Sequence, residues 1–288
     1  MITVVIVTYN SERYIKNCLQ SILENSIRSK IEIVLVDNAS QDKTLTIVRR
    51  FPKIRLIKNK INIGFASAVN QATAQAKGDI LLLNPDTLIG EGVFDEFTSL
   101  SKKTSLAAIS CSVRNFDGSF QPSCGNFPGA FNILLDRIPL IRNLYPKSEI
   151  IRSVEFYRKL QYPDWASGTC LFLRKKALKK VGGFDENYFM YLEDVDWCYR
   201  AKKAGFRILY TPDCNVIHAD EGKSPKKSPN KFFNMRKGFI TFFQKSKNPK
   251  ELLIFKILLY FELFLKKYFL GPKSQVWLET YNKTADLI

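Results

Sequence analysis

The stretch Leu81-Leu82-Leu83-Asn84-Pro85-Asp86 decides the fold class of this chain. A short apolar run that ends at turn-forming residues is typical of a buried strand in a parallel sheet. In open α/β sheets, ligands bind at the carboxyl ends of the strands, so Asn84 and Asp86 are expected at a ligand-binding edge. Two oxygen-bearing side chains one residue apart can converge on one hard cation, and Pro85 fixes the turn between them. The stretch therefore predicts both a buried strand and a cation site that follows it.

Strands and helices alternate on the N-terminal side of this stretch. Strands are predicted at Thr3–Thr8, Glu32–Val36 and Ile54–Ile57, and an alanine-rich helix at Phe65–Ala76 leads into the strand before Asn84. Strands that alternate with helices at this spacing predict a mostly parallel, doubly wound sheet. The fold class is therefore α/β, with helices on both faces of the sheet.

Polar residues follow the first two predicted strands, in the stretches Thr8-Tyr9-Asn10 and Asp37-Asn38-Ala39-Ser40. A carboxylate at this edge can accept a hydrogen bond from the N3–H of uracil or thymine, or from a ribose hydroxyl. A dinucleotide-binding oxidoreductase also places an acid here, but it needs a Gly-x-Gly-x-x-Gly loop, and the first loop contains no glycine. The alternative is a capped turn, in which Ser40 starts the next helix without competing with a ligand role for Asp37.

Three acids, Glu193, Asp194 and Asp196, open a predicted helix that ends before Gly205. Acids in the first turn complement the helix dipole, which explains part of this pattern. A carboxylate at a helix start beside an apolar wall is also suited to act as a general base, because such an environment tunes its proton affinity. Asp194 is the favoured base, and for Glu193 capping and function carry equal weight.

His218 is the only histidine in the chain, and it follows the strand-like stretch Asn215-Val216-Ile217. A neutral imidazole could complete an oxygen-rich site begun by Asp86, a donor set that suits manganese or magnesium. A purely structural histidine is the equal alternative.

The chain carries a formal net charge of +17, and residues 221–288 hold 14 Lys/Arg against 5 Asp/Glu. Strong basicity indicates polyanionic partners, such as anionic lipid, nucleic acid or phosphorylated substrates. Nucleic acid is excluded as a partner because the sequence has no recognised binding motif and places acids at its predicted strand ends. The six cysteines show no metal-ligand spacing, so free thiols are expected.

Targeting signals and spanning segments are not expected. The apolar run Ile2–Val7 is too short for an export signal and has no basic flank. The stretch Leu252–Leu270 is interrupted by Lys256, Glu262, Lys266 and Lys267, so it predicts an amphipathic basic helix rather than a membrane span. The expected location is the cytoplasm. Two roles stay open for the apolar face of this helix: contact with the membrane interface, or packing on the same protein or a second subunit.

An ordered set of motifs resembles glycosyltransferase family 2, a family with the GT-A fold, and within it the bacterial rhamnosyltransferases. The matching segments run over about three quarters of the chain: Val4–Asn10, Val36–Ser40, Asn62–Ala66 with Asn70, Gly78-Asp79, Leu83–Asp86, Gly182–Glu186, Phe189–Asp196 and His218. The resemblance implies a catalytic domain at residues 1–220 and a basic helical extension at residues 221–288. It also implies an inverting transferase that uses a nucleotide-diphospho-sugar and a divalent cation, Mn²⁺ or Mg²⁺.

The resemblance assigns roles to individual residues. Asp194 is the base that deprotonates the acceptor, and Asp86 and His218 are the metal ligands. The donor-binding residues are Thr8, Tyr9, Asn10, Asp37, Asn38, Asn62, Gly64, Asn70 and Asn84. The acceptor-binding residues are Trp165, Gly168 and Glu193, although a core position is the equally weighted alternative for Trp165.

The donor and acceptor also follow from the resemblance. Many GT-A enzymes carry Asp-x-Asp at the metal position, whereas this chain has Asn84 in place of the first acid, and an amide binds a cation less strongly. Within the resembling subgroup this replacement favours dTDP-rhamnose, with a glycan or lipid-linked glycan of the bacterial cell surface as acceptor. Another UDP- or dTDP-sugar and a catalytically inactive interaction protein are the alternatives. An oligomer and a peripheral position on the inner face of the plasma membrane stay open.

Overall fold

The computed structural model describes residues 1–26, 29–135, 149–219, 228–246, 248–269, 271 and 274–288. The expected domain boundary at residue 220, most of the basic stretch that follows it, and the expected end of the amphipathic helix at Leu270 lie outside these residues.

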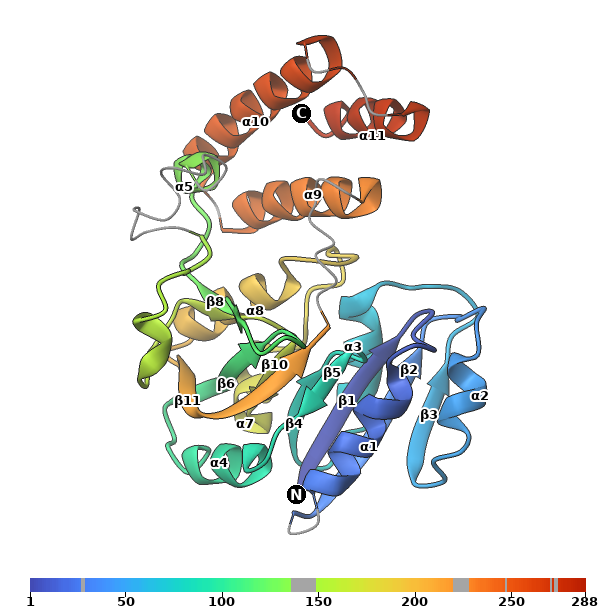
Figure 1. Cartoon of the computed structure of the whole chain (residues 1–288). Coiled ribbons are helices and arrows are strands. Elements are labelled where there is room, and N and C mark those ends of the chain that lie inside the picture. The colour runs from blue at the N-terminus through green and yellow to red at the C-terminus, as the bar shows by residue number, and fades with distance from the viewer. Residues whose placement is uncertain (27–28, 136–148, 220–227, 247, 270, 272–273) are drawn as a thin grey trace.

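One central sheet organises the described part of the chain, in the strand order β3-β2-β1-β4-β10-β6-β11-β5, with β7 beside β6 (Figure 1). Its strands are β1 (Ile2–Thr8), β2 (Ile31–Asp37), β3 (Ile54–Lys58), β4 (Asp79–Leu83), β5 (Thr87–Ile89), β6 (Leu106–Arg114), β7 (Phe120–Gln121), β10 (Cys170–Leu173) and β11 (Arg207–His218). The four strands from β3 to β4 are parallel, as expected. Beyond them the sheet is mixed, because β10 lies between β4 and β6 and is antiparallel to both.

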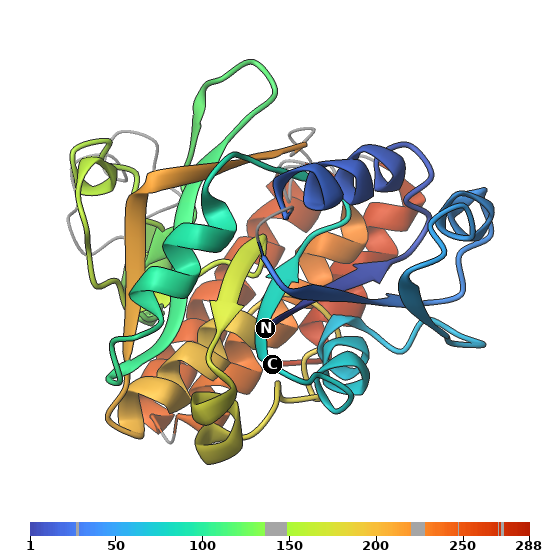
Figure 2. The ribbon, with the colours of Figure 1, turned by 90° about the horizontal axis from the view of Figure 1, so that it is seen from below.

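Helices cover both faces of the sheet. Every residue of β1 is buried, as the continuous apolar run of a two-sided strand requires. Val4 and Ile6 pack in the apolar cluster that includes residues of α1 (Ile15–Asn25), α2 (Thr44–Val48) and α4 (Val93–Leu100). Val5 and Val7 pack in the opposite cluster, with α3 (Phe65–Thr73), α7 (Lys175–Val181) and α8 (Glu193–Lys203). Figure 2 shows α1, in dark blue, and α3, in light blue, on opposite sides of the sheet.

The expected α/β class is confirmed, and the first strands agree with their predicted bounds to within one residue. Two elements differ from their predicted bounds. Helix α3 ends at Thr73 rather than Ala76. Strand β11 is 12 residues long, whereas only its last residues were predicted, because its pairing with β6 shifts register between Thr211 and Asn215 and the alternation of side chains is interrupted there. All six cysteines are buried free thiols, as expected.

The C-terminal helices are α9 (Pro229–Lys245), α10 (Pro249–Phe264) with a π-helical turn η2 (Leu265–Phe269), and α11 (Gln275–Ala285). Ser228 and Asn248 cap α9 and α10 by accepting backbone N–H groups, and each helix has proline in its first turn. Figure 1 shows α10 and α11 at the end of the molecule farthest from the N-terminus. Aromatic residues of α9, including Phe239 and Phe243, belong to the same apolar cluster as Trp197 of α8. Within the described residues, no helix is long and apolar enough to cross a bilayer.

Candidate functional site

The structure brings Asn84, Asp86 and His218 together at the end of β4. His218 is the last residue of β11 and pairs with Thr87 of the antiparallel neighbour β5. Its Nε2 lies 3.3 Å from Oδ1 of Asp86 and 3.4 Å from Nδ2 of Asn84. The backbone supports this contact, because the amide of Ala219 donates to the carbonyl of Asp86 at 2.9 Å. Strand pairing alone therefore joins two positions that are 134 residues apart in the sequence.

Gln121 orients the histidine, a role that the sequence analysis missed. Its Oε1 lies 3.1 Å from Nδ1 of His218. A carbonyl oxygen only accepts hydrogen bonds, so the imidazole proton is favoured on Nδ1 and the lone pair of Nε2 is directed towards Asp86. This is the arrangement of a metal-binding histidine and its supporting partner. Only the position of Gln121 in β7, beside β6, reveals it.

These residues fit a divalent cation that is shared with a substrate. Within the described part of the chain, no group of three or more His, Cys, Asp or Glu residues is placed to hold a metal ion. A site of Asp86 and His218 with the amide of Asn84 leaves coordination positions of an octahedral cation open to other ligands. Magnesium characteristically uses one or two protein carboxylates and completes its shell with water and substrate phosphate oxygens. The donor set therefore fits a cation held jointly with a diphosphate.

A cavity of about 740 Å³ adjoins His218. Its size is within the range of small-molecule binding sites. It lies between the start of α1 and the loop after β6, and its lining residues are Arg13, Tyr14, Asn17, Asn115, Phe116, Asp117, His218 and Ala219. The lining combines a guanidinium, a carboxylate and two amides with two aromatic rings, a composition that suits a polar ligand.

Thr8 and Asp37 meet at the carboxyl ends of β1 and β2. Asp37 is buried, and its Oδ1 accepts the hydroxyls of Thr8 at 2.8 Å and Ser40 at 2.6 Å. Its Oδ2 accepts the backbone N–H of Ser40 at 3.0 Å. The expected helix cap by Ser40 is not formed, because α2 begins at Thr44 after Lys43 and has no side-chain cap. Ser40 instead closes a turn in which Asp37 is the acceptor. Tyr9 and Asn10, which follow β1, are exposed, and Asn10 has a left-handed backbone with a φ of 52°.

The other expected donor-binding residues hold loops together. Nδ2 of Asn38 donates to the carbonyl of Gly64 at 3.1 Å, and Oδ1 of Asn62 accepts the N–H of Gly64 at 3.0 Å. Gly64 has a φ of 88°, and a Cβ there would lie 2.7 Å from the carbonyl oxygen of Phe189. Asn70 accepts from the N–H of Phe184 and donates to its carbonyl, both within 2.9 Å. The contacts of Asn38 and Asn62 hold the loop before α3, and those of Asn70 hold the loop before α8. The predicted contacts of these residues with a nucleotide remain predictions.

Asp194 lies at the start of α8 and is linked through the backbone to the end of β4. Its Oδ2 accepts the N–H of Gly168 at 2.9 Å, and its Oδ1 accepts the N–H of Val195 at 2.8 Å. Thr169, which follows Gly168, accepts the N–H of Asn84 through its backbone carbonyl at 3.1 Å. Gly168 and Thr169 therefore connect the candidate base with the end of β4.

Burial raises the pKa of both acids at the start of α8. Loss of hydration raises the pKa of Asp194, and its two N–H partners oppose that rise. The pKa of Glu193 rises well above the ordinary carboxyl value because it is buried and, secondly, because it lies beside Asp194. Among the described residues, Oε2 of Glu193 has no hydrogen-bond partner. Asp194 is half-buried and holds defined hydrogen bonds, so it is the better placed of the two to exchange a proton with a substrate.

The turn before α8 is strained and is supported by α9. Tyr191 and Leu192 have φ values of 74° and 70°, a left-handed conformation that costs free energy for residues other than glycine. Gly238 of α9 packs against this turn, and a Cβ at Gly238 would lie 3.1 Å from the carbonyl oxygen of Tyr191. The C-terminal helices therefore contribute to the position of Asp194.

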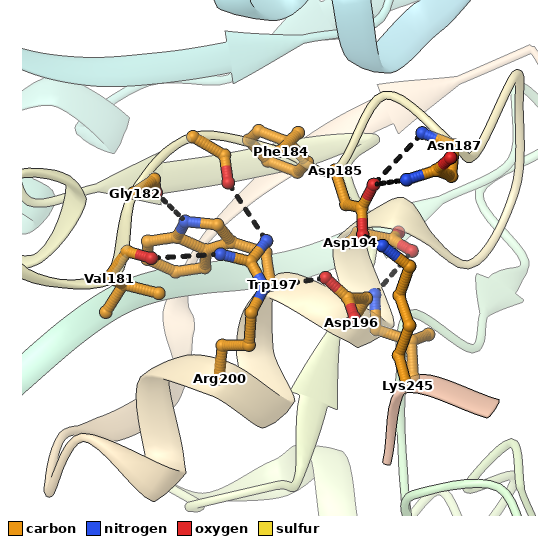
Figure 3. A network of polar contacts seen from close by, with 12 residues as sticks. Val181, Gly182, Phe184, Asp185, Asn187, Asp194, Asp196, Trp197, Arg200 and Lys245 are labelled. Atoms are coloured by element: carbon orange, nitrogen blue, oxygen red, sulfur yellow. Dashed lines mark hydrogen bonds and ion pairs between the residues drawn. The ribbon is translucent and has the colours of Figure 1, made fainter. Parts of the chain in front are cut away.

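Asp196 has a structural role, which Figure 3 shows together with its surroundings. It is buried and accepts Nε of Arg200 at 2.7 Å. Arg200 also donates to the carbonyls of Val181 and Gly183, at 3.1 and 2.9 Å. Nε1 of Trp197 donates to the carbonyl of Gly182 at 3.0 Å, so two side chains of α8, those of Trp197 and Arg200, hold this loop. Farther along the loop, Asp185 pairs with Lys245 of α9.

Trp165 is in the environment of a core residue. It lies in β9 (Trp165–Ala166), which pairs with β8 (Cys124–Gly125) outside the main sheet. The indole is 8% exposed, and its Nε1 donates to the carbonyl of Asn126 at 2.9 Å. These contacts favour the structural alternative, and the acceptor-binding role predicted for Trp165 gains no support from them.

We predict that Arg200→Met lowers the free energy of unfolding by about 3 kcal/mol, because it leaves the carboxylate of Asp196 buried without its partner. Burial already raises the pKa of Asp196 even beside Arg200. The destabilisation should therefore be smaller at acidic pH, where Asp196 takes up a proton. Urea unfolding at two pH values measures both effects. Arg158→Met, which breaks an exposed ion pair with Glu155, is the matched control and should cost about 0–1 kcal/mol. An equal loss in both variants would contradict the structural role.

Comparisons with known proteins agree with this geometry. The family description "Glycosyl transferase family 2" matches residues 3–121. The N-acetylglucosaminyl-diphospho-decaprenol L-rhamnosyltransferase of Mycobacterium tuberculosis is 33% identical over 237 residues, which are 76% of each chain. Rhamnosyltransferase WbbL of Escherichia coli K12 is 26% identical over 76% of this chain and 83% of its own length.

Solved structures show the same fold. The mannosyltransferase PcManGT from Pyrobaculum calidifontis, in complex with GDP-Man and Mn²⁺, superposes with a TM-score of 0.60 over 98% of this chain and 73% of its own, at 22% identity. TarS of Staphylococcus aureus with UDP gives a TM-score of 0.56 over 84% of this chain and 65% of its own, at 19% identity. From its motifs, its relatives and its GT-A fold, this chain belongs to glycosyltransferase family 2 and is similar to bacterial rhamnosyltransferases.

Proposed function

We propose that this protein is an inverting, metal-dependent glycosyltransferase that moves rhamnose from dTDP-rhamnose to a hydroxyl of a lipid-linked glycan in bacterial cell-surface polysaccharide synthesis. The observation that carries the proposal is the convergence of Asn84, Asp86 and His218, joined to Asp194 through Gly168 and Thr169. The names of the two rhamnosyltransferase relatives support the sugar, and the first name supports a polyprenyl-diphosphate-linked acceptor.

In this proposal, residues 1–220 form the catalytic domain and residues 221–288 an extension, and the enzyme works at the inner face of the plasma membrane. Asp86 and His218, with Asn84, would hold Mn²⁺ or Mg²⁺. The cation would neutralise the negative charge that develops on the leaving diphosphate. The Mn²⁺ in the complex of the mannosyltransferase with the same fold supports this assignment. The base and ribose would contact the donor-binding residues around Thr8 and Asp37, and the sugar would lie towards Gly168.

Asp194 performs the proton transfer in this mechanism. Its carboxylate removes the proton from the acceptor hydroxyl while that oxygen attacks the anomeric carbon from the face opposite the diphosphate. The bond to the diphosphate breaks in the same displacement, so the configuration at the anomeric carbon inverts. The N–H groups of Gly168 and Val195 hold the carboxylate in position. Because burial raises its pKa, the carboxylate is a stronger base than an exposed one.

We predict that, among dTDP-rhamnose, UDP-glucose, UDP-N-acetylglucosamine and GDP-mannose, only dTDP-rhamnose is hydrolysed at an appreciable rate by the full chain with Mn²⁺. The reason is that a pocket built to hydrogen-bond one base and sugar leaves its buried polar groups unpaired with another. Release of nucleoside diphosphate is the measurement, and the Asp86→Ala variant gives the background. If a UDP-sugar is hydrolysed faster than dTDP-rhamnose, that UDP-sugar becomes the proposed donor. If no donor is bound or hydrolysed, the alternative of an inactive interaction protein applies.

A further inference from the structure

Helix α10 and the turn η2 expose a row of large apolar side chains. Leu253, Ile257, Tyr260, Phe261, Phe264 and Tyr268 are between 40% and 65% exposed. Their spacing of three and four residues places them on one side of the helix. We call this row the outer face. Figure 1 shows α10 at the end of the molecule, beyond α9.

The opposite side of α10 is already packed against the protein. Phe255, Leu259 and Leu263 are at most 6% exposed, and the ring of Phe255 lies 5.4 Å from that of Phe239 in α9. The apolar residues of α10 thus form two stripes, of which only one contributes to the protein core. Packing in the protein core therefore does not explain why the outer face is apolar.

Apart from Lys250, which is exposed, the charged residues of α10 also contact the protein. Glu262 accepts from Arg236 of α9 at 2.9 Å and from Lys266 at 2.7 Å. Glu251 accepts the N–H of Ala130 in α5 (Ala130–Leu135), and Lys256 donates to the carbonyl of Ile288 at 2.8 Å. A surface helix of a soluble protein normally turns its charges to water and its apolar residues to the core. In α10 this arrangement is reversed, so the side of the helix that faces solvent is apolar.

The chemistry of the outer face fits a lipid interface. A contiguous exposed apolar patch on a soluble protein is typical of a binding surface. Tyrosine and phenylalanine beside leucine and isoleucine are the residues that enter the boundary between headgroups and acyl chains. The rings of Tyr260, Phe264 and Tyr268 already contact one another along the helix.

Charge decides between a membrane and a second copy of the chain. Residues 221–288 hold 14 Lys/Arg against 5 Asp/Glu, and Lys250 at the start of α10 is exposed. A symmetric dimer through this face would bring two such basic regions together, whereas anionic headgroups attract them. We propose that the outer face of α10 docks the protein on an anionic membrane surface. The inference rests on the proposed function in one respect, since a polyprenyl-diphosphate-linked acceptor would be met at that surface.

The test measures binding of the full chain to vesicles of phosphatidylglycerol and phosphatidylcholine by flotation, at low and high salt. The double variant Phe261→Glu with Phe264→Glu changes two outer-face residues. The matched control is Val154→Glu with Leu160→Glu, which adds the same charge at exposed apolar positions in another part of the molecule. We expect wild-type protein and the control to bind, with release at high salt, and the outer-face variant to lose at least tenfold in partitioning.

Each outcome discriminates. Equal losses in the two double variants would show that charge alone drives binding and would overturn the role of the outer face. A wild-type dimer in light scattering that becomes monomeric in the outer-face variant, without vesicle binding, would assign the face to a second copy. Hydrolysis of soluble dTDP-rhamnose is measured alongside. If the wild type binds vesicles but hydrolyses no donor, the proposed function fails and the docking surface stands. Equal melting temperatures confirm that the variants fold.

Discussion

Asp194→Asn is expected to lower the rate of sugar transfer by about 10²- to 10⁴-fold while leaving donor binding intact, because the amide cannot accept the proton of the acceptor hydroxyl. Transfer measured at saturating donor, together with calorimetry of dTDP binding, separates the two effects. The substitution is nearly isosteric. It replaces one carboxylate oxygen that accepts an N–H, from Gly168 or Val195, by an N–H donor.

That replacement leaves one backbone N–H without an acceptor, which costs about 1–3 kcal/mol of stability. The melting temperature is therefore measured with the rate. Asp95→Asn, at an exposed position in the first turn of α4, makes the same chemical change far from the site and should leave transfer unchanged. Near-wild-type turnover of Asp194→Asn would move the base to Glu193. Asp196 is a poor substitute because its carboxylate is held by Arg200.

The pH profile of the same variant provides a second check. A general base works only when it is ionised, and burial raises the pKa of Asp194 above the ordinary carboxyl value. The rate should therefore fall as the pH falls through that raised pKa, at a higher pH than an exposed aspartate would give. This acidic limb should be absent from the residual activity of Asp194→Asn.

Asp86→Ala is expected to remove metal-dependent donor binding and to lower activity by roughly a hundredfold or more, because the carboxylate of the proposed cation site is lost and the charge of the leaving diphosphate is no longer neutralised. His218→Ala should weaken the Mn²⁺ dependence without abolishing it, since one of several ligands is lost. Calorimetry of the nucleotide with and without Mn²⁺ measures both variants.

Asp95→Ala is the matched control for this experiment, because it removes an exposed carboxylate from α4. One result with EDTA would contradict the metal assignment. If EDTA leaves both nucleotide binding and activity of the wild type intact, the metal assignment is wrong for Asp86 and His218 alike.

The ends of β1, β2 and β4 were predictable because their signal is local. A strand buried on both faces needs a continuous apolar run, and the polar residues after it fall at the ligand edge by chain connectivity alone. The start of α8 was predictable for a similar reason, since three acids in one turn are visible in the sequence. The contact between His218 and Asp86 was expected from the resemblance, and strand pairing between β11 and β5 produces it.

The sequence did not predict which distant residue a polar side chain forms a hydrogen bond with. The side chains of Asn70 and Asn38 form hydrogen bonds to loops that lie far away in the sequence. The residue types allow a ligand contact or an internal one, and only the position of the neighbouring loop selects between them. The antiparallel insertion of β10 between β4 and β6 was not predictable either. The alternation of side chains along a strand carries no information about the direction of the neighbouring strand.

Helix α10 shows most clearly which features follow from the sequence and which depend on the tertiary structure. The sequence by itself determined that residues around 252–264 are helical and that their charges share one side, because both follow from the spacing of residues along a helix. Only the tertiary structure decided which side faces the protein. The pairing of Glu262 with Arg236 of α9 and of Glu251 with α5 turns the charged side inwards and leaves the outer face apolar. Rotation about a helix axis is set by such partners, and no periodicity within the helix contains them.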